Sequence, residues 1–525
     1  MSFEYEQEIK GKIYVYTIKS YWDKEKQQSR QKRVYLGRKD PKTGAIVSTK
    51  KSGTPKGSHS FGGVFFLKQI IKELKLDVVL KKAFPDSFEK YLYLAMFKIL
   101  TSEAYYLYPY WKQESHLPDE STLESQRISQ LLQDLGENEK SVEDFFYEWI
   151  KVNNAKSSVM FDITSLSSYS ENNDLLEYGY NRDKECLEQV NIGLISKELG
   201  NSSMHTPLAY RIYPGSIADV STVTNILELV TQYKLELSHC VMDRGFYSSE
   251  NIKSLHQKGL KYLIPVPFST LLAKNLALDC YQEVSSPLNS FTFRDEVYFH
   301  CYKKVTIDDT KCTLHIFLDK QRKAREENKL LKKISEIEKC FADKSFKTIQ
   351  LAEQYIVETL KSKKKFFVIK KGARRFSIIR NKNILDQEIA QLGMFIIDTN
   401  QNEINRVQIL ENYRAKDGVE KIFQSFKHDI NEKRSRTKSA KTMKGSFFIN
   451  FIALILLSRI TQVMTQKELF KSFTKAELFK TLVSLKVFTL ANDMTLLAEV
   501  SKKQKTIFSA FNQKLVDPSY NLTGF

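Results

Sequence analysis

Short apolar segments that alternate with helical patterns, from residue 157 onward, constrain the fold of this chain most. Each has the length of a buried strand: SSVMFD, QVNIGLI, PLAYRIY, HCVMD, YLIPV and GMFIIDT. Helical patterns lie between several of them, including GSIADVSTVTNILELV and SSENIKSLHQKG. This alternation predicts an α/β sheet with helices on its faces. In such sheets, ligands gather at the ends of strands.

Two acidic residues follow such segments directly. Asp162 ends the segment SSVMFD, and Asp243 ends HCVMD. A lone Asp at a strand end is more often a cap or a turn residue than a catalytic group. The two aspartates would suggest a catalytic site only together with a third acidic residue.

A third candidate lies in the segment YRAKDGVEKIFQSFK. At about 100° per helical residue, four side chains fall within a narrow arc of one helix face: Tyr413, Lys416, Glu420 and Lys427. Two ammonium groups and a phenol beside a carboxylate are poorly suited to cover a core. Asp417, one turn before Glu420, competes for the same role, and Tyr413 alone would more often be a packed aromatic.

An acidic triad of Asp162, Asp243 and Glu420 would need cations, because three clustered carboxylates do not all stay ionised alone. Mg²⁺ prefers carboxylate oxygens and keeps positions for water and phosphate. Two such ions about 4 Å apart can activate a water or a 3′-hydroxyl in phosphodiester chemistry. Lys416 and Lys427 would neutralise the phosphates of the substrate.

The charge of the chain favours a polyanionic partner. The net charge is +19 and the pI about 9.3, which suits nucleic acid or an anionic membrane surface, although solubility alone would also explain it. The six cysteines form no CxxC pair, which argues against a zinc site. The apolar run at 447–457 is too short to cross a bilayer and predicts a buried helix, so we expect no membrane partner.

The most basic stretch lies at 361–382, with ten Lys or Arg residues and no Asp or Glu. Its pattern predicts a hairpin that turns at Lys371 and Gly372. A basic ribbon with interleaved Phe residues could follow a nucleic-acid backbone, although Lys residues also guard edge strands against aggregation. The DNA contacts that we expect from charge are Arg244, Lys370, Lys371, Arg374 and Arg375.

Together these motifs resemble the DDE transposases of bacterial insertion sequences, in the group with a Y-x2-R-x3-E-x6-K third motif. The chain has this motif at Tyr413, Lys416, Glu420 and Lys427, with Lys416 in place of the usual arginine. That exchange keeps the charge and loses a bidentate fork. The other motifs of the resemblance are Asp162 to Thr164, Asp243 to Phe246, NRDKECLEQVNIGL, and the turn at Gly215 with Asp219 after it.

The resemblance implies a ribonuclease H-like catalytic core with a β-rich insertion between the second and third acidic residues. It implies that Asp162, Asp243 and Glu420 bind two Mg²⁺ ions, which Mn²⁺ can replace. Tyr413, Lys416 and Lys427 would contact phosphates near the transposon end. Some members stack a flipped base on a Trp of the insertion. This chain has no Trp there, so a Phe would have to substitute. Cleavage through a DNA hairpin is likewise implied by the resemblance alone.

On this basis the expected fold class is α/β, with an N-terminal β/helical DNA-binding region and a helical C-terminus. The expected parts are a small basic β-rich region (1–60, either a DNA-contacting module or a solvated sheet), a helical DNA-binding region (61–152), the first part of the core (153–266), the β-rich insertion (267–391), the second part of the core (392–465) and a helical C-terminal region (466–525).

The predicted function is a transposase that cleaves the inverted-repeat ends of its element and joins them to target DNA. We expect a homodimer on double-stranded DNA, in the bacterial cytoplasm at the nucleoid. Two alternatives remain at this stage. One is a ribonuclease H-like nuclease without strand transfer, and the other is a catalytically inactive DNA-binding derivative.

Overall fold

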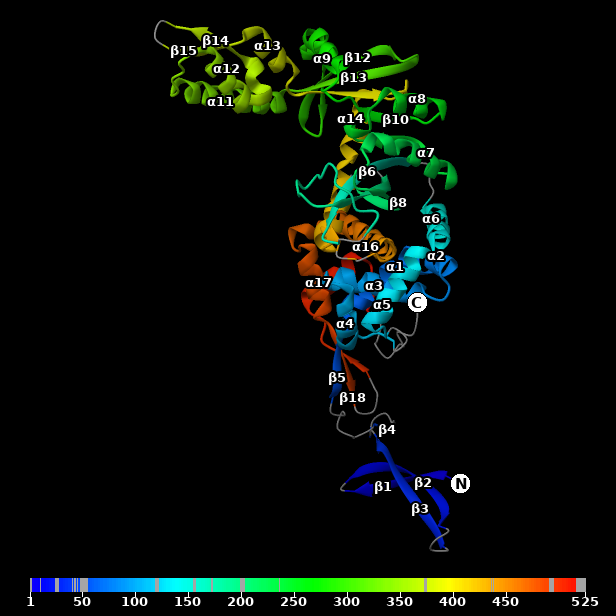
Figure 1. Ribbon diagram of the computed structural model, residues 1–525. Coiled ribbons are helices and arrows are strands. Elements are labelled where there is room, and N and C mark those ends of the chain that lie inside the picture. Colours follow the sequence, from blue (N-terminus) through cyan, green and yellow to red (C-terminus); the bar gives the residue numbers. More distant parts are fainter. Residues whose placement is uncertain are drawn as a thin grey trace. The chain divides into compact units, whose positions relative to one another are not determined.

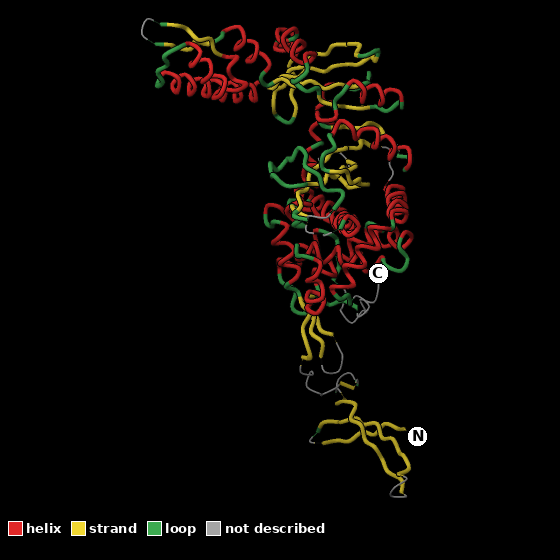
Figure 2. Tube along the Cα trace, viewed as in Figure 1, coloured by secondary structure: helices red, strands yellow, loops and turns green. Residues whose placement is uncertain are grey.

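The computed structural model describes residues 2–9, 11–23, 28–39, 41, 44, 46–47, 55–118, 122–153, 157–170, 173–198, 204–235, 237–372, 375–435, 437, 439–490 and 495–515. Figure 1 labels the elements, and Figure 2 separates helices from strands. One compact unit contains residues 1–66, 110–120 and 478–524, and the other contains residues 67–109 and 121–477.

The first unit is built on two antiparallel sheets, with the strand orders β1-β2-β3-β4 and β19-β18-β5. Its elements are β1 (Ser2–Ile9), β2 (Lys12–Asp23), β3 (Gln28–Lys39), β4 (Ile46–Val47), β5 (Pro55–Ser60), β18 (Lys486–Leu490), β19 (Thr495–Leu497) and α18 (Lys502–Ala510). Three helices have residues in both units: α1 (Gly62–Glu73), α4 (Tyr108–Glu114) and α17 (Lys475–Val483).

The expectation of an all-helical C-terminal region, 466–525, is wrong in its middle. β18 pairs with β5, a strand from the opposite end of the chain, and turns back to pair with β19. The segment KVFTL has the β-branched and aromatic residues of a strand. Its partner lies so far away in the sequence that a local pattern could not reveal the pairing.

The second unit is organised by one large mixed sheet with the order β11-β12-β13-β16-β10-β9-β6-β7-β8, to which β17 adds beside β6. Its strands are β6 (Ser157–Ser168), β7 (Gln189–Glu198), β8 (His205–Pro214), β9 (Leu237–Met242), β10 (Tyr262–Pro265), β11 (Ser290–Phe293), β12 (Glu296–Ile307), β13 (Thr310–Asp319), β16 (Met394–Thr399) and β17 (Arg434–Ser435).

The centre of this sheet has a distinctive connectivity. The first three strands in sequence, β6, β7 and β8, pair antiparallel in that order. β9 then pairs parallel with β6 on its other side, and β10 pairs parallel with β9. Five consecutive strands of the sequence therefore lie in the spatial order third, second, first, fourth, fifth.

The helices of this unit that accompany the sheet precede its first strand in sequence, lie between its strands or follow them. They are α2 (Leu76–Ala83), α3 (Phe88–Thr101), α5 (Ser125–Glu137), α6 (Glu139–Asn153), α7 (Val223–Gln232), α8 (Ser249–Gln257), α9 (Leu271–Asp279), α10 (Tyr281–Ser285), α14 (Arg406–Ala415), α15 (Asp417–Gln424) and α16 (Ala440–Gln466). Ser248 caps α8, since its side chain accepts a hydrogen bond from the Asn251 amide at 3.1 Å.

Helix α16 contains the apolar run noted in the sequence. By length and composition it could cross a membrane, but 83% of its most apolar window is buried inside the protein. It packs against α3, α5 and β8. The crossing with α5 is close because Gly136 and Gly445 face the backbone of the opposite helix, where any side chain would collide. The helix is therefore a core element of this unit.

The region expected as a β-rich insertion, 267–391, differs from that expectation. Its strands β11, β12 and β13 extend the large sheet beyond β16 instead of forming a sheet of their own. The rest is a mainly helical cluster with its own small core, made by α11 (Lys320–Ala342), α12 (Ile349–Leu360), α13 (Lys382–Gln391) and the hairpin β14 (Phe367–Lys371) and β15 (Phe376–Arg380). Strand patterns do not specify which sheet edge a strand will join.

Candidate active site

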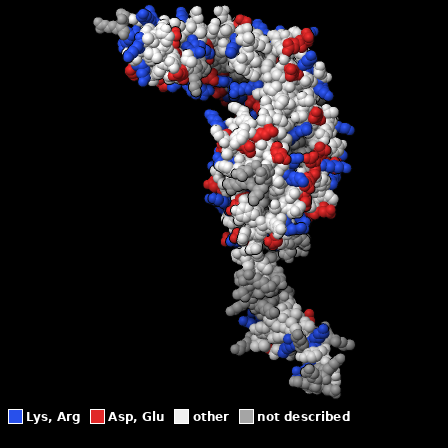
Figure 3. All heavy atoms as spheres, in the orientation of Figure 1, with Lys and Arg blue, Asp and Glu red and all other residues white. Residues whose placement is uncertain are grey.

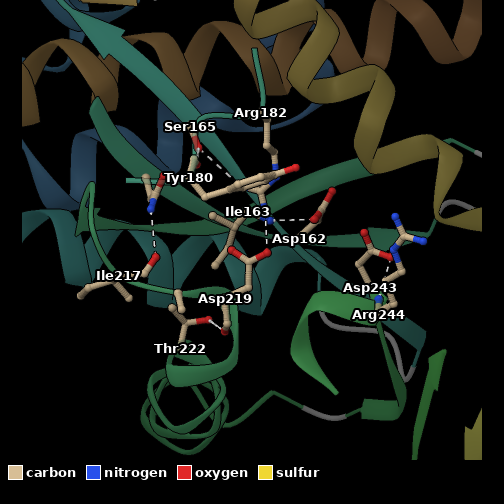
Figure 4. Close-up of polar contacts among 12 residues, drawn as sticks. Asp162, Ile163, Ser165, Tyr180, Arg182, Ile217, Asp219, Thr222, Asp243 and Arg244 are labelled. Atoms are coloured by element: carbon tan, nitrogen blue, oxygen red, sulfur yellow. Dashed lines mark hydrogen bonds and ion pairs between the residues drawn. The ribbon is translucent and has the colours of Figure 1, made fainter. Parts of the chain in front are cut away.

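The pairing of β6 with β9 brings Asp162 and Asp243 side by side. This parallel pairing ends with Phe161 opposite Met242, so an aspartate follows at the same level on each strand. β6 itself continues to Ser168 because it stays paired with β7. The prediction that this strand ends at Asp162 is therefore wrong in its boundary, while the placement of both carboxylates at the end of the parallel pair is correct (Figure 4).

Backbone amides orient both carboxylates. Asp162 Oδ1 accepts a hydrogen bond from the Ile163 amide at 2.8 Å. Asp243 Oδ1 accepts one from the Arg244 amide at 2.7 Å, which caps the short 3-10 turn η4 (Arg244–Phe246). Both side chains are partly buried and partly accessible to a ligand. Arg244 itself is exposed beside them.

The third carboxylate comes from the helical segment after β16. Asn405 starts α14 with a capping box, in which its side chain accepts from the Gln408 amide at 3.0 Å. Lys416 joins α14 to α15 with helical dihedral angles. Glu420 lies one turn further on, in the first turn of α15, and is exposed.

Lys416 connects the two parts of this site. Its Nζ lies 3.0 Å from Asp243 Oδ1 and 3.5 Å from Glu420 Oε1. The ammonium group thus lies between a carboxylate of the sheet and a carboxylate of the helix. The i, i+4 pair on the helix is what the sequence predicts, and the contact with Asp243 is a tertiary one.

The charged groups of the site shift one another's pKa values. Burial raises the pKa of Asp162 to about 7, and the neighbouring charge of Asp243 acts in the same direction. Burial alone would lower the pKa of Lys416, but the charge and hydrogen bond of Asp243 outweigh it, so that pKa is raised. Two carboxylates thus crowd one another, and the ammonium group stays charged between them.

A second ion pair, between Arg182 and Asp219, lies near the carboxylates. Arg182 Nη2 lies 2.6 Å from Asp219 Oδ2, and the same arginine contributes to the electrostatic field at Asp162. Asp219 also faces Gly245 in the turn after Asp243. Arg182 and Asp219 belong to segments that carry the sequence resemblance, but sequence reasoning gave neither residue a role.

Residues 201–456 match the model of a family described as "Transposase DDE domain". This part of the chain is similar to transposase DDE domains. The match includes Asp243 and Glu420, while Asp162 precedes it. No curated protein matches the chain. A solved structure titled "Cryo-EM structure of piggyBac transposase synaptic complex with hairpin DNA" is similar with 12% identity and a TM-score of 0.37, over 83% of this chain and 82% of that one.

The donor set of this site fits a divalent cation. The Lys416 ammonium lies between the carboxylates of Asp243 and Glu420, and Asp162 follows β6 beside Asp243 and acts on Lys416 through its charge. Carboxylate oxygens are ligands that Mg²⁺ and Mn²⁺ prefer. Asp162, Asp243 and Glu420 are the residues that would hold such ions.

Lys427 does not join the other three side chains of the predicted helix face. Lys427 lies inside a π-helical turn, η7 (Ser425–Asp429), which follows α15. Each residue of a π turn advances less than the 100° of an α-helix, so the side chain lags behind the face. Lys427 Nζ instead pairs with Asp183 Oδ2 at 2.8 Å.

Tyr413 lies on the predicted side of the helix and is half-buried. Its ring stacks against Phe395 of β16, with 5.9 Å between centroids and 23° between planes. Its hydroxyl contributes to the raised pKa of Lys416. Tyr413 is therefore a packed aromatic residue and also lies at the site.

The basic hairpin turns where the sequence predicts, and the Gly372 amide donates to the Arg375 carbonyl at 3.0 Å. Lys370, Lys371 and Arg375 are exposed on it, whereas Arg374 lies outside the described residues. The hairpin is fixed to the helical cluster by Arg380 on Glu338 and by Lys365 on Glu388. Figure 3 shows Lys and Arg side chains over this cluster. These residues form a basic surface separate from the carboxylates.

Proposed function

We propose that the protein is a DNA transposase of the bacterial insertion-sequence group with the Tyr-Lys-Glu-Lys variant of the third motif. It would bind the terminal inverted repeats of its element, cleave them and join the ends to target DNA. The observation that carries this proposal is that Lys416 pairs with both Asp243 and Glu420, while the parallel pairing of β6 and β9 places Asp162 beside Asp243.

The strand order supports a ribonuclease H-like core. Three antiparallel strands followed by two parallel ones, in the order β8-β7-β6-β9-β10, form the arrangement that the sequence resemblance implies. The carboxylates lie where the first and fourth of these strands end their pairing, with the helical carboxylate opposite them. Ligands of open α/β sheets bind at this kind of strand end.

In this reaction, Asp162, Asp243 and Glu420 would hold two Mg²⁺ ions, with Mn²⁺ as a substitute. The bound ions supply activation of the attacking oxygen and charge compensation for the leaving one. Lys416 would move from the carboxylates to a phosphate once cations and DNA are present. Tyr413, beside Lys416, would limit where that phosphate can lie.

Duplex DNA is the proposed substrate because the site suits phosphodiesters and the chain carries a net charge of +19. Arg244 lies beside the carboxylates and would contact the scissile strand. Lys370, Lys371, Arg374 and Arg375 on the hairpin would hold the DNA further from the cut. Two subunits would act on paired ends as a homodimer at the bacterial nucleoid. A hairpin intermediate is an optional step of this scheme.

The test is cleavage of duplex DNA from the ends of the element that encodes the chain. Wild type should nick this DNA with Mg²⁺, and Asp243→Asn and Glu420→Gln should each lose at least about 10³-fold in rate. Asp417→Asn is the matched control, because Asp417 lies one turn from Glu420 and contacts neither Lys416 nor Asp243 by any ion pair of the described residues. DNA binding must persist in all variants.

Three results would redirect the proposal. Nicking without joined products on a supercoiled target would identify a nuclease. Tight binding of the ends without metal-dependent nicking by wild type would identify a DNA-binding derivative. Loss of activity in Asp417→Asn with full activity in Glu420→Gln would exchange the roles of these two residues.

A further inference from the structure

The four-stranded sheet β1–β4 carries a row of tyrosine side chains on one face. Its register places Tyr5 of β1 opposite Tyr16 of β2, and Tyr16 opposite Tyr35 of β3. Directly opposed residues on neighbouring strands point to the same face of a sheet. Tyr14, two residues before Tyr16, points the same way. The rings of Tyr14 and Tyr16 lie 6.1 Å and 5.2 Å from that of Tyr35.

Guanidinium groups lie on this same face, which we call the tyrosine face. The Arg33 guanidinium lies 4.0 Å from the ring centroid of Tyr16 and 4.9 Å from that of Tyr5. Arg33 also donates a hydrogen bond to Gln7 Oε1 at 2.7 Å, which fixes the plane of the group. Arg33 is exposed, so the outer side of its guanidinium plane is open to a ligand.

A register shift adds a second arginine. Between Val15 and Tyr16 the pairing with β3 slips by one residue, so Arg38 comes opposite Tyr14. Without the slip, the alternation of a strand would turn Arg38 to the opposite face from Arg33. The irregularity therefore gathers both arginines on the tyrosine face.

The carboxylates of β1 lie on the opposite face. Glu4, Glu6 and Glu8 alternate with Tyr5 and Gln7 along the strand, so they point away from the rings. The ion pair between Glu6 and Lys39, at 2.8 Å, lies on that opposite face. The tyrosine face thus carries positive charge and aromatic rings, while these three negative charges are kept on the other side.

Part of the tyrosine face is open to solvent. Tyr5 is 43% exposed and Trp22 is 62% exposed. Trp22 lies on β2 six residues after Tyr16, so it shares the face. The exposed rings extend the row along the strand direction.

We propose that the tyrosine face binds the unpaired bases of single-stranded DNA. Bases stack on aromatic rings and on guanidinium planes without requiring a particular sequence, and Arg33 and Arg38 would attract the phosphates. In a duplex the base faces are already stacked on one another, so this flat face selects an unpaired strand. The choice of DNA over RNA rests on the proposed function.

The test uses the full chain and a labelled oligothymidylate, with binding followed by fluorescence anisotropy. Tyr16→Leu and Arg33→Gln should each weaken binding at least about fivefold, as expected for loss of one stacking contact. Tyr16→Phe keeps the ring and should bind as wild type, which separates stacking from folding. Lys19→Gln is the charge-matched control, because Lys19 is exposed on the opposite face of β2.

Trp22 gives a second readout. Stacking of a base on its ring should quench its fluorescence, and Trp22→Phe should lose that part of the quenching. A wild type that does not nick DNA but binds the unpaired strand would count against the proposed function alone.

Four outcomes would overturn the inference. The first is an equal loss of affinity in Arg33→Gln and Lys19→Gln. The second and third are tighter binding of duplex DNA than of the single strand at the tyrosine face, and tighter binding of oligouridylate RNA than of the oligothymidylate. The fourth is a self-association that Tyr16→Leu abolishes while DNA binding is unchanged. The last outcome would make the face a contact between two copies of the chain.

Discussion

Lys416 reaches from the start of α15 to Asp243 at the end of β9, with 3.0 Å between Nζ and Oδ1. The contact ties the helix that carries one carboxylate of the site to the strand that carries another. Because the ammonium group also lies 3.5 Å from Glu420, it compensates negative charge at the place proposed for a divalent cation. Cation binding and this ion pair should therefore compete.

Removing that ammonium should strengthen binding of divalent cations in the absence of DNA. For Lys416→Met we expect about fivefold tighter Mn²⁺ binding, the effect of about 1 kcal/mol of lost repulsion. Titration followed by electron paramagnetic resonance measures it. Lys421→Met removes an equal charge from the exposed neighbour of Glu420 and should change the affinity less. Equal affinities in wild type and Lys416→Met would contradict competition.

A buried carboxyl away from the site should make stability depend on pH. Asp398 in β16 is fully buried, accepts a hydrogen bond from the Tyr262 hydroxyl at 3.2 Å, and leaves Oδ2 without a partner. Burial raises the pKa of Asp398 to about 7. The folded state then binds one more proton than the unfolded chain between about pH 4 and pH 7, so this group lowers stability as the pH rises through that range.

Asp398→Asn imitates the protonated carboxyl and should remove this dependence. We expect its melting temperature to rise by about 2–6 °C at pH 8 and to change little at pH 4. Differential scanning calorimetry at the two pH values measures the difference. Asp386→Asn, at an exposed position of α13, is the control and should show neither effect. A destabilised Asp398→Asn at pH 8 would mean that the carboxyl is ionised and paired in the fold.

Gly245 should be sensitive to the smallest side chain. A Cβ at this position would lie 2.8 Å from Asp219 Oδ2, and Asp219 cannot retreat freely because Arg182 holds it at 2.6 Å. The turn after Asp243 would have to shift instead. We expect Gly245→Ala to lower the nicking rate at least about tenfold, since small displacements of catalytic groups are costly, while the protein remains folded.

Gly57→Ala is the comparison for this substitution, because its Cβ would make only an ordinary contact of 3.5 Å with His59. It should leave the rate unchanged. Full activity in Gly245→Ala would show that Asp219 moves and that the turn does not depend on it.

The sequence predicted the parts of the site that are local. Two apolar strands ending near an aspartate, and the i, i+4 pair of Lys416 and Glu420, follow from periodicity within a few residues. The side-by-side placement of Asp162 and Asp243 needed one more step, namely that β6 and β9 are parallel neighbours. The resemblance implied only that the three carboxylates share one site. The spacing of residues alone left Asp417 as an alternative to Glu420.

The parts that failed depend on contacts between distant segments. Lys427 does not lie on the predicted helix face, because a π-helical turn that no residue pattern predicts changes the direction of its side chain. Its ammonium group pairs with Asp183 instead. β12 and β13 lie in the stretch predicted to be β-rich, but β16, the strand that pairs with β13, lies beyond a helical cluster in the sequence. β18 likewise pairs with β5 from the other end of the chain. Strand propensity predicts that a segment forms a strand, but it does not predict which strand it pairs with.

The basic hairpin β14–β15 should contribute to DNA affinity mainly through phosphate contacts. Replacing Lys370, Lys371 and Arg375 by Gln removes three exposed positive charges from the hairpin. The slope of log Kobs against log salt concentration should then fall by about 2–3, in line with one released counterion per lost phosphate contact. The hairpin should stay folded, because the ion pairs that fix it use Arg380 and Lys365.

A triple Gln variant at Lys329, Lys332 and Lys339 of α11 removes the same charge from exposed positions of the same cluster. If net charge alone attracts DNA, both variants should lose affinity equally and the salt slopes should match. If the hairpin is a docking ribbon, the hairpin variant should lose more affinity on duplex DNA of any sequence, since phosphate contacts carry no base specificity. Equal slopes would assign the Lys residues of the hairpin to protection of an edge strand.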